Sequence, residues 1–312
     1  MSRFSSIVVG VDFSQCSAVA LGQALRIAGW SGGALHVVHV LDTLVVTELE
    51  EALSMQEGVR DGLVSDARKA WREFAARVPG AERLPIEVAI DNRSAGILKR
   101  ARQDQADLLV LGALGESGMG IGVGTVASAC VRKSAADVLL VCEVRPRAGA
   151  APFQTIVAAV DFSPTSLRAV EEAAAIATHD GAGLHVLHVF QAPWHRLHYR
   201  APTPEAAPHF QKQYRDCLER RLHEFCRPAL EAQASPRAHF VVHDYAGHRS
   251  GIVDYAQSVS ADLIVLGTRG RANLRDVLLG STAEKALQES ACSILAVKPE
   301  EFEHAPATAA GS

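Results

Sequence analysis

The sequence predicts an α/β protein of two tandem doubly wound domains, each with a five-stranded parallel sheet covered by helices on both faces. Short apolar runs rich in Val, Ile and Leu alternate with longer amphipathic stretches along most of the chain, which is the pattern of buried parallel strands joined by crossover helices. The chain has 312 residues and is 48% hydrophobic, which is enough for two cores of ordinary domain size. The third observation is an internal repeat of about half the chain length.

The repeat is visible in two blocks of sequence. SSIVVGVDFS from Ser5 recurs as QTIVAAVDFS from Gln154, and DLLVLGALG before residue 116 recurs as DLIVLGTRG before residue 271. A repeat of half the chain indicates two copies of one domain rather than a short-period solenoid. Pro, Gly and Ala gather between the copies, as in a linker. We therefore expect domain 1 at residues 1–147, a linker at 148–152, domain 2 at 153–299 and a disordered tail at 300–312.

Both copies contain the same series of strands and helices. The strands are expected where short runs of β-branched and other apolar residues occur, and the helices where apolar residues recur every three or four positions. Ser14 and Ser163 follow the first strand of each copy and can cap the next helix, and Pro164 suits the first turn of the second copy. A last helix is expected before the fifth strand of each copy. The first copy is expected to have strands at 7–11, 34–41, 85–90, immediately before Gly112 and at 138–141, with its other helices at about 17–28, 63–75 and from Ser94. The second copy is expected to have strands at 156–160, 184–190, 239–243, 263–266 and 293–297, with helices at about 166–178, 214–226 and from Ser250.

A glycine-rich loop follows the fourth strand of the second copy. Gly267 and Gly270 come first, then nine residues, then Gly280 and the start of a helical pattern. Glycines allow the backbone to approach a ligand closely, and the N–H groups at a helix N-terminus attract phosphate oxygens. The loop is not a Walker A motif, because no G-K-[ST] follows the glycines. It is also not the G-x-G-x-x-G fingerprint that follows a first strand.

The spacing G-x2-G-x9-G-S resembles the ATP-binding signature of the universal stress protein family, and the resemblance covers about residues 4–145 and 153–299. It implies the strand order 3-2-1-4-5, so that strands 1 and 4 flank the crevice where ligands bind. It also implies that domain 2 binds ATP together with Mg²⁺, and that Asp161 contacts the nucleotide. A carboxylate there can accept from ribose hydroxyls or help to hold Mg²⁺. Outside such a site it would serve as a turn or cap residue. The positions expected to bind the nucleotide are Ala159, Asp161, Val189, Gly267, Arg269, Gly270, Gly280, Ser281 and Thr282.

The first copy departs from this pattern. Eight residues rather than nine separate Gly115 from Gly124, and Leu114 and Glu116 stand where the second copy has Arg269 and Arg271. A carboxylate beside a triphosphate is repulsive. We therefore expect the first copy to bind ATP weakly, to bind another ligand or to be structural. Its matching positions are Asp12, Val40, Gly112, Gly115, Gly124 and Thr125.

Composition excludes several other classes of protein. The net charge is −4 with Lys and Arg scattered, which argues against nucleic acid or an anionic membrane as partner. The six cysteines form no C-x-x-C pair, and the N-terminus has no signal-peptide pattern, so reduced thiols and a cytoplasmic location are expected. His36 and His39 are three residues apart in a strand and should point to opposite faces, so a metal site is not expected there. No catalytic residues are predicted.

These inferences predict an ATP-binding module of the stress response, in which nucleotide occupancy changes conformation or association. The two copies are expected to pack as an intrachain pseudo-dimer. Two chains are expected to form a homodimer, with the edges of the fifth strands as plausible contacts. Two alternatives remain open: a slow ATPase, and a sensor that binds a metabolite or lipid in domain 1.

Overall fold

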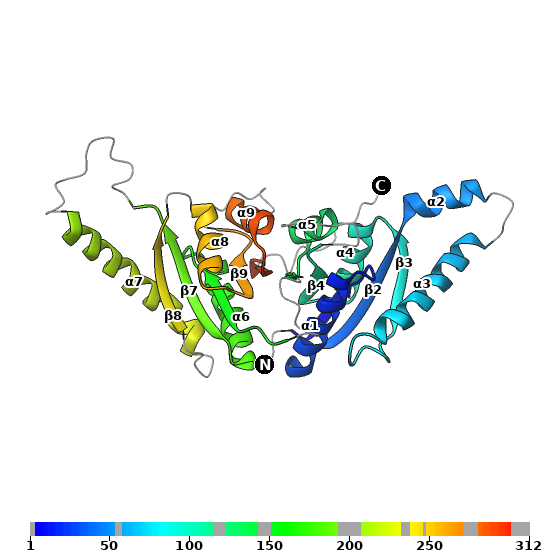
Figure 1. Ribbon diagram of the computed structural model, residues 1–312, viewed down its shortest axis with the longest axis horizontal. Coiled ribbons are helices and arrows are strands. Elements are labelled where there is room, and N and C mark those ends of the chain that lie inside the picture. The colour runs from blue at the N-terminus through cyan, green and yellow to red at the C-terminus, as the bar shows by residue number, and fades with distance from the viewer. Residues whose placement is uncertain are drawn as a thin grey trace, which may run out of the picture.

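A computed structural model describes residues 4–53, 58–114, 123–142, 151–192, 207–231, 238–245, 248–270 and 280–300. Several predicted features lie outside the described residues: Gly115, Glu116, Arg271, part of the expected linker and residues 301–312 of the expected tail. Figure 1 shows two α/β halves side by side, with β2 and β3 toward one end and β7 and β8 toward the other. None of the described helices is both long and apolar enough to cross a membrane.

The N-terminal half forms a parallel sheet in the order β3-β2-β1-β4-β5. The predicted order 3-2-1-4-5 is therefore confirmed in this half. One helix that the sequence analysis did not predict, α2, follows the second strand; it begins where the Asp42 side chain accepts a hydrogen bond from the Leu44 N–H at 3.1 Å. The elements are β1 (Ser6–Gly10), α1 (Gln15–Ser31), β2 (Ala34–Asp42), α2 (Thr43–Ala52), α3 (Val59–Ala75), β3 (Ile86–Asp91), α4 (Arg93–Gln103), β4 (Leu108–Gly112), α5 (Thr125–Lys133) and β5 (Asp137–Val141).

The C-terminal half repeats this arrangement. Its parallel strands run in the order β8-β7-β6-β9-β10, which is again 3-2-1-4-5. Ser163 caps the first helix of this half by accepting from the Ser166 N–H, and Pro164 stands in its first turn, as predicted. The elements are β6 (Thr155–Ala159), α6 (Pro164–Asp180), β7 (Gly183–Phe190), α7 (Ala207–Glu231), β8 (Ala238–Asp244), α8 (His248–Ser258), β9 (Leu263–Gly267), α9 (Ser281–Glu289) and β10 (Ser293–Val297).

The two sheets join through their fifth strands. β5 and β10 pair antiparallel, with Leu139 opposite Leu295, so the described strands form one ten-stranded sheet. The expectation that fifth-strand edges contact a second chain is wrong, because these two edges pair with each other inside the chain. The outermost strands of the sheet are β3 and β8.

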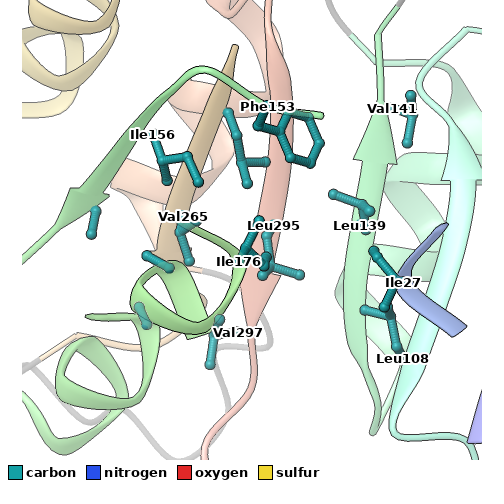
Figure 2. Close-up of a cluster of buried hydrophobic side chains, with 14 of the residues drawn as sticks. Ile27, Leu108, Leu139, Val141, Phe153, Ile156, Ile176, Val265, Leu295 and Val297 are labelled. Atoms are coloured by element: carbon teal, nitrogen blue, oxygen red, sulfur yellow. The ribbon is translucent and has the colours of Figure 1, made fainter. Parts of the chain in front are cut away.

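Each face of this sheet has one hydrophobic core that continues through both halves. Helices α1, α3, α6 and α7 contribute to one cluster, and α4, α5, α8 and α9 to the other. Figure 2 shows the first cluster at the join, where Ile27 and Leu139 of the N-terminal half lie on one side and Ile176 and Leu295 of the C-terminal half on the other. Because all four side chains are buried, we infer that the join is part of the core rather than a solvated contact.

Candidate functional site

The first and fourth strands of the C-terminal half end side by side, and their following loops touch. β6 and β9 are neighbouring parallel strands with Ala158 opposite Val265. A Cβ atom placed on Gly270 would lie 2.5 Å from Asp161 Oδ2, which is closer than real Cβ atoms approach. The backbone at Gly270 thus lies against the Asp161 carboxylate, and the two stretches that the sequence analysis assigned to one site do converge.

Asp161 stands at the start of a strained turn. The Ser163 N–H donates to Asp161 Oδ1 at 3.0 Å, and Phe162 between them has a φ of 62°. The N-terminal half repeats this turn: the Ser14 N–H donates to Asp12 Oδ1 at 3.1 Å and Phe13 has a φ of 65°. Positive φ is uncommon for bulky residues, and such strain concentrates at functional sites. The repeated Asp-Phe-Ser was visible in the sequence, but its backbone conformation was not.

A histidine from the second strand supports each turn, and the sequence analysis did not assign it this role. His188 Nδ1 donates to Val160 O at 2.8 Å, and its ring lies 4.5 Å from the Phe162 ring, centroid to centroid. His39 makes the equivalent bond to Val11 O at 2.8 Å and stacks on the Phe13 ring at 4.4 Å. The usable signal was the recurrence of the second strand's histidine in both copies.

Burial lowers the pKa of His39, while its bond to Val11 and the charge of Asp12 oppose this shift. The unfolded chain therefore binds the proton more readily, so stability should be full above the ordinary histidine pKa of about 6.5 and fall as pH drops below it. We predict that the urea midpoint decreases from pH 7 to pH 5, and that His39→Gln, which can still donate to Val11 O, flattens this decrease. An equal decrease in the variant would contradict the assignment.

The glycine loop of the C-terminal half is held at both ends through Thr268, which bonds to the last strand. Thr268 donates from its backbone N–H and its hydroxyl to Val297 O, at 2.8 and 3.1 Å. The Gly280 N–H then donates to Thr268 O at 2.7 Å, which brings the start of α9 back beside Gly267. Gly280 is the N-cap of α9 and provides no side-chain cap. The first N–H groups of this helix therefore have no acceptor from the capping side chain and point, with the positive end of the helix, toward the loop.

The remaining predicted positions surround this loop. Ala159 is buried at the end of β6, Val189 is half-buried near the end of β7, and Thr282 is half-buried in the first turn of α9. Arg269 is also half-buried, and its charge lowers the pKa of Lys298, after the larger effect of burial. The positive charge of Arg269 is thus at the loop, close to the seam between the halves. Ser281 is exposed.

The N-terminal half has the same anchors despite its shorter loop. The Ala113 N–H donates to Val141 O at 2.9 Å, and the Gly124 N–H donates to Ala113 O at 2.7 Å. Gly124 is the N-cap of α5, and Thr125 is exposed. The missing residue therefore leaves both ends of the loop in equivalent positions. The two halves differ in the residue packed against the glycine that ends the fourth strand. Cys16 lies against Gly112 in the N-terminal half, and Thr165 lies against Gly267 in the C-terminal half.

A glycine that the sequence analysis missed lies against each second-strand valine. A Cβ atom on Gly251 would be 2.7 Å from Val189 Cγ1, and one on Gly96 would be 2.9 Å from Val40 Cγ1. The valine walls of the two crevices are thus close-packed against helices α8 and α4. Both glycines stand in the first turns of those helices, and their recurrence was the available signal.

Other candidate groups among the described residues do not come together in a site. His36 lies 3.5 Å from Asp104 near α4, whereas His39 faces the strained turn, so the two point to opposite faces as predicted. Within the described ranges, no group of three or more His, Cys, Asp or Glu side chains is placed to hold a metal ion. The six cysteines are free thiols.

This fold, with a glycine loop and a helix N-terminus where strand order reverses, belongs to the class of doubly wound domains that bind ligands at the carboxyl ends of their strands. The model of the universal stress protein family matches residues 3–141 and 152–298. The chain therefore belongs to the universal stress protein family and contains two of its domains.

The relatives include proteins with two such domains and proteins with one. Universal stress protein Rv1996 of Mycobacterium tuberculosis is 26% identical over 317 residues, which covers 94% of each chain. A universal stress protein of Thermus aquaticus is 32% identical over 151 residues, covering 47% of this chain and 99% of its own. A universal stress protein structure from Archaeoglobus fulgidus has a TM-score of 0.63 at 18% identity, covering 96% of this chain and 99% of its own. The structural match supports the tandem fold.

Proposed function

We propose that the C-terminal half binds ATP with its Mg²⁺, and that occupancy of this site makes the protein a nucleotide-dependent module of the stress response. The observation that supports this most is the close approach of the Gly270 backbone to the Asp161 carboxylate, where an added Cβ atom would lie 2.5 Å from Oδ2. It brings a phosphate-type loop and an acidic group to one crevice. The sequence resemblance to the family's ATP-binding signature supplies the identity of the nucleotide.

Each part of the site has a proposed role. The backbone near Ala159 and Val189 contacts the adenine, and Asp161 accepts from the ribose or helps to hold Mg²⁺. The N–H groups at the start of α9 and the Arg269 charge hold phosphate oxygens. The proposed phosphate-binding positions are Gly267, Arg269, Gly270, Gly280, Ser281 and Thr282.

We propose that the N-terminal half is the weaker site. Its loop has equivalent anchors, but Leu114 replaces Arg269, so one positive charge for a polyphosphate is missing. We assign no catalytic residue to either half. We also propose that the halves act as an intrachain pseudo-dimer in the cytoplasm, where reduced thiols are usual. A homodimer of chains would need a surface other than the fifth strands.

The test compares matched variants of the two halves. The full-length protein is purified without added nucleotide, and the released nucleotides are identified and counted for wild type, Asp161→Ala and Asp12→Ala. We expect about one ATP per chain in wild type and in Asp12→Ala. Asp161→Ala should lose at least about tenfold in ATP affinity on titration, because a charge-linked contact is typically worth 1.5 kcal/mol or more.

Two outcomes would contradict the proposal in different ways. Two ATP per chain, with one lost in each variant, would show that the N-terminal half binds as well. No bound nucleotide and no binding on titration with ATP, ADP or AMP would remove ATP as the ligand. That second outcome would favour the sensor alternative.

A further inference from the structure

The seam between the halves is formed by positions that match each other in the repeat. Leu139 and Leu295 are the same position of the two copies, and they are directly opposite in the antiparallel pair of β5 and β10. Trp30 and His179 also match, and their rings stack with centroids 4.2 Å apart. A pseudo-two-fold axis therefore passes through the seam. Each contact that lies away from this axis has a symmetry-related contact on the other side of it. The residues that make the two contacts can therefore be compared.

One such pair of contacts is charged on one side and neutral on the other. The Lys298 N–H donates to Asp137 Oδ1 at 2.7 Å. At the equivalent place the Cys142 N–H donates to Ser293 Oγ at 3.2 Å. Lys298 and Asp137 are only 3% and 5% exposed, and the Lys298 ammonium donates to Val131 O across the seam. The Asp137 carboxylate is therefore desolvated. At the equivalent place an uncharged serine hydroxyl accepts the same backbone hydrogen bond.

Arg168 adds to the charged side. Its guanidinium donates to Lys298 O, and its Nη2 lies 3.7 Å from Asp137 Oδ2. Burial lowers the pKa of Lys298 to about 8, while the charge of Asp137 opposes this. The carboxylate of the other half thus favours the charged form of the ammonium. The position that matches Arg168 in the N-terminal half is Val19.

A second buried ion pair crosses the seam near the ends of α1 and α6. Arg26 of the N-terminal half pairs with Asp180, whose side chain is 2% exposed. The matching positions are Ala175 for Arg26 and Ser31 for Asp180. This pair therefore also has a neutral equivalent. Within its own half Arg26 donates to Gln23 Oε1 and Asp180 accepts from the Phe153 N–H, so the opposite charge in each case comes from the other half.

Pairing two like halves through this seam would leave these charges buried without their partners. Two C-terminal halves would place each Lys298 opposite Ser293, although Arg168 would keep Glu300, now 4.0 Å away. Two N-terminal halves would place each Asp137 opposite Cys142. Removing one partner of a buried ion pair is strongly unfavourable, because the other charge remains desolvated.

We propose that this seam is a charge-coded interface on which an N-terminal half accepts a C-terminal half and rejects a second N-terminal half. The residues that set this choice are Asp137, Lys298, Arg26 and Asp180. The two halves of one chain therefore pair with each other. Two chains can share this interface only as a domain-swapped dimer, in which each N-terminal half pairs with the C-terminal half of the other chain. This inference is independent of nucleotide binding.

The test uses the folded full-length chain with a protease site introduced between residues 143 and 150. Unlabelled and ¹⁵N-labelled proteins are cleaved after purification, mixed and analysed by native mass spectrometry. We expect only complexes of one N-terminal with one C-terminal half, with labels exchanged between them. Complexes of two like halves, or separation of the cleaved halves at micromolar concentration, would overturn the proposal.

A variant removes the code by using residues that the chain already has at the matching positions. In Arg26→Ala, Asp180→Ser, Asp137→Ser, Lys298→Cys, complexes of like halves should appear. Arg132→Ala is the matched control, because Arg132 also pairs across the seam, with Glu284 at 3.1 Å, but is 47% exposed. The control should behave as wild type. A fourfold variant that still forms only mixed pairs would overturn the proposal.

A second measurement tests the proposal even if the fourfold variant does not fold. The urea midpoints of the uncut chain are compared for Asp137→Ser, Lys298→Cys and the double variant. Each single variant should lower the midpoint, and the double variant should lower it by less than the sum of the two. Strictly additive losses would mean that the two residues do not recognise each other, which contradicts the proposal.

Discussion

Gly280→Ala is expected to weaken ATP binding by roughly 100-fold or more. Gly280 has a φ of −66°, which alanine adopts readily, so the chain should still fold. A Cβ atom would lie 3.3 Å from Thr268 O, and the bond from the Gly280 N–H to that oxygen would have to shift. Two charge-assisted bonds to phosphate, at about 1.5–3 kcal/mol each, account for the expected loss. Isothermal titration calorimetry with ATP measures it.

The matched control is Gly124→Ala in the N-terminal half. Gly124 is the N-cap of α5 and donates to Ala113 O at 2.7 Å, so the substitution makes the same local change in the proposed weaker site. We expect its ATP affinity to equal that of wild type. Unchanged affinity in Gly280→Ala, with a wild-type urea midpoint, would remove the C-terminal loop as the binding site. Equal losses in both variants would mean two working sites.

Leu139→Ala and Leu295→Ala are each expected to lower the free energy of unfolding of the whole chain by about 2–5 kcal/mol, as truncation of a buried leucine does. The two side chains are at most 1% exposed and lie opposite each other at the seam. Because they are repeat equivalents in one core that includes both halves, the losses should be similar. Urea unfolding followed by tryptophan fluorescence and circular dichroism measures both.

The control for these variants is Leu44→Ala on α2, where the leucine is 74% exposed. It should change the free energy of unfolding by less than about 0.5 kcal/mol. In the two seam variants, fluorescence and circular dichroism should report one coincident transition. Two separate transitions, with only one shifted in each variant, would show that the halves unfold independently and that the shared core does not couple them.

Much of the fold could be predicted because its signals are local. The last strand was expected at 293–297, where β10 (Ser293–Val297) lies, since a run of apolar residues between turns is sufficient to identify a buried strand. Helix α2 was missed for the converse reason. Of the residues in α2 only Val46 is buried, whereas Leu44 and Val45 are exposed, so the apolar residues of this helix do not mark one buried face. Its start depends on the Asp42 cap, which is a weaker signal.

The candidate site was predictable in its parts but not in its geometry. The glycines and Asp161 could be placed at two strand ends, and the resemblance to a family indicated that these ends are neighbours. The positive φ of Phe162 and the bond from His188 to Val160 O could not be predicted. Both depend on contacts between strands that are distant in the sequence, and phenylalanine ordinarily disfavours this backbone conformation.

The sequence by itself determined that the chain is two copies of one α/β domain, with an intact glycine loop in the second and an altered one in the first. Repeats, apolar runs and loop lengths are properties of the chain alone. Only the tertiary structure decided what the fifth strands do. The pairing of Leu139 with Leu295, and of Asp137 with the Lys298 N–H, joins residues at least half the chain apart. Such a pairing depends on contacts between residues that are distant in the sequence, and no local pattern contains that information.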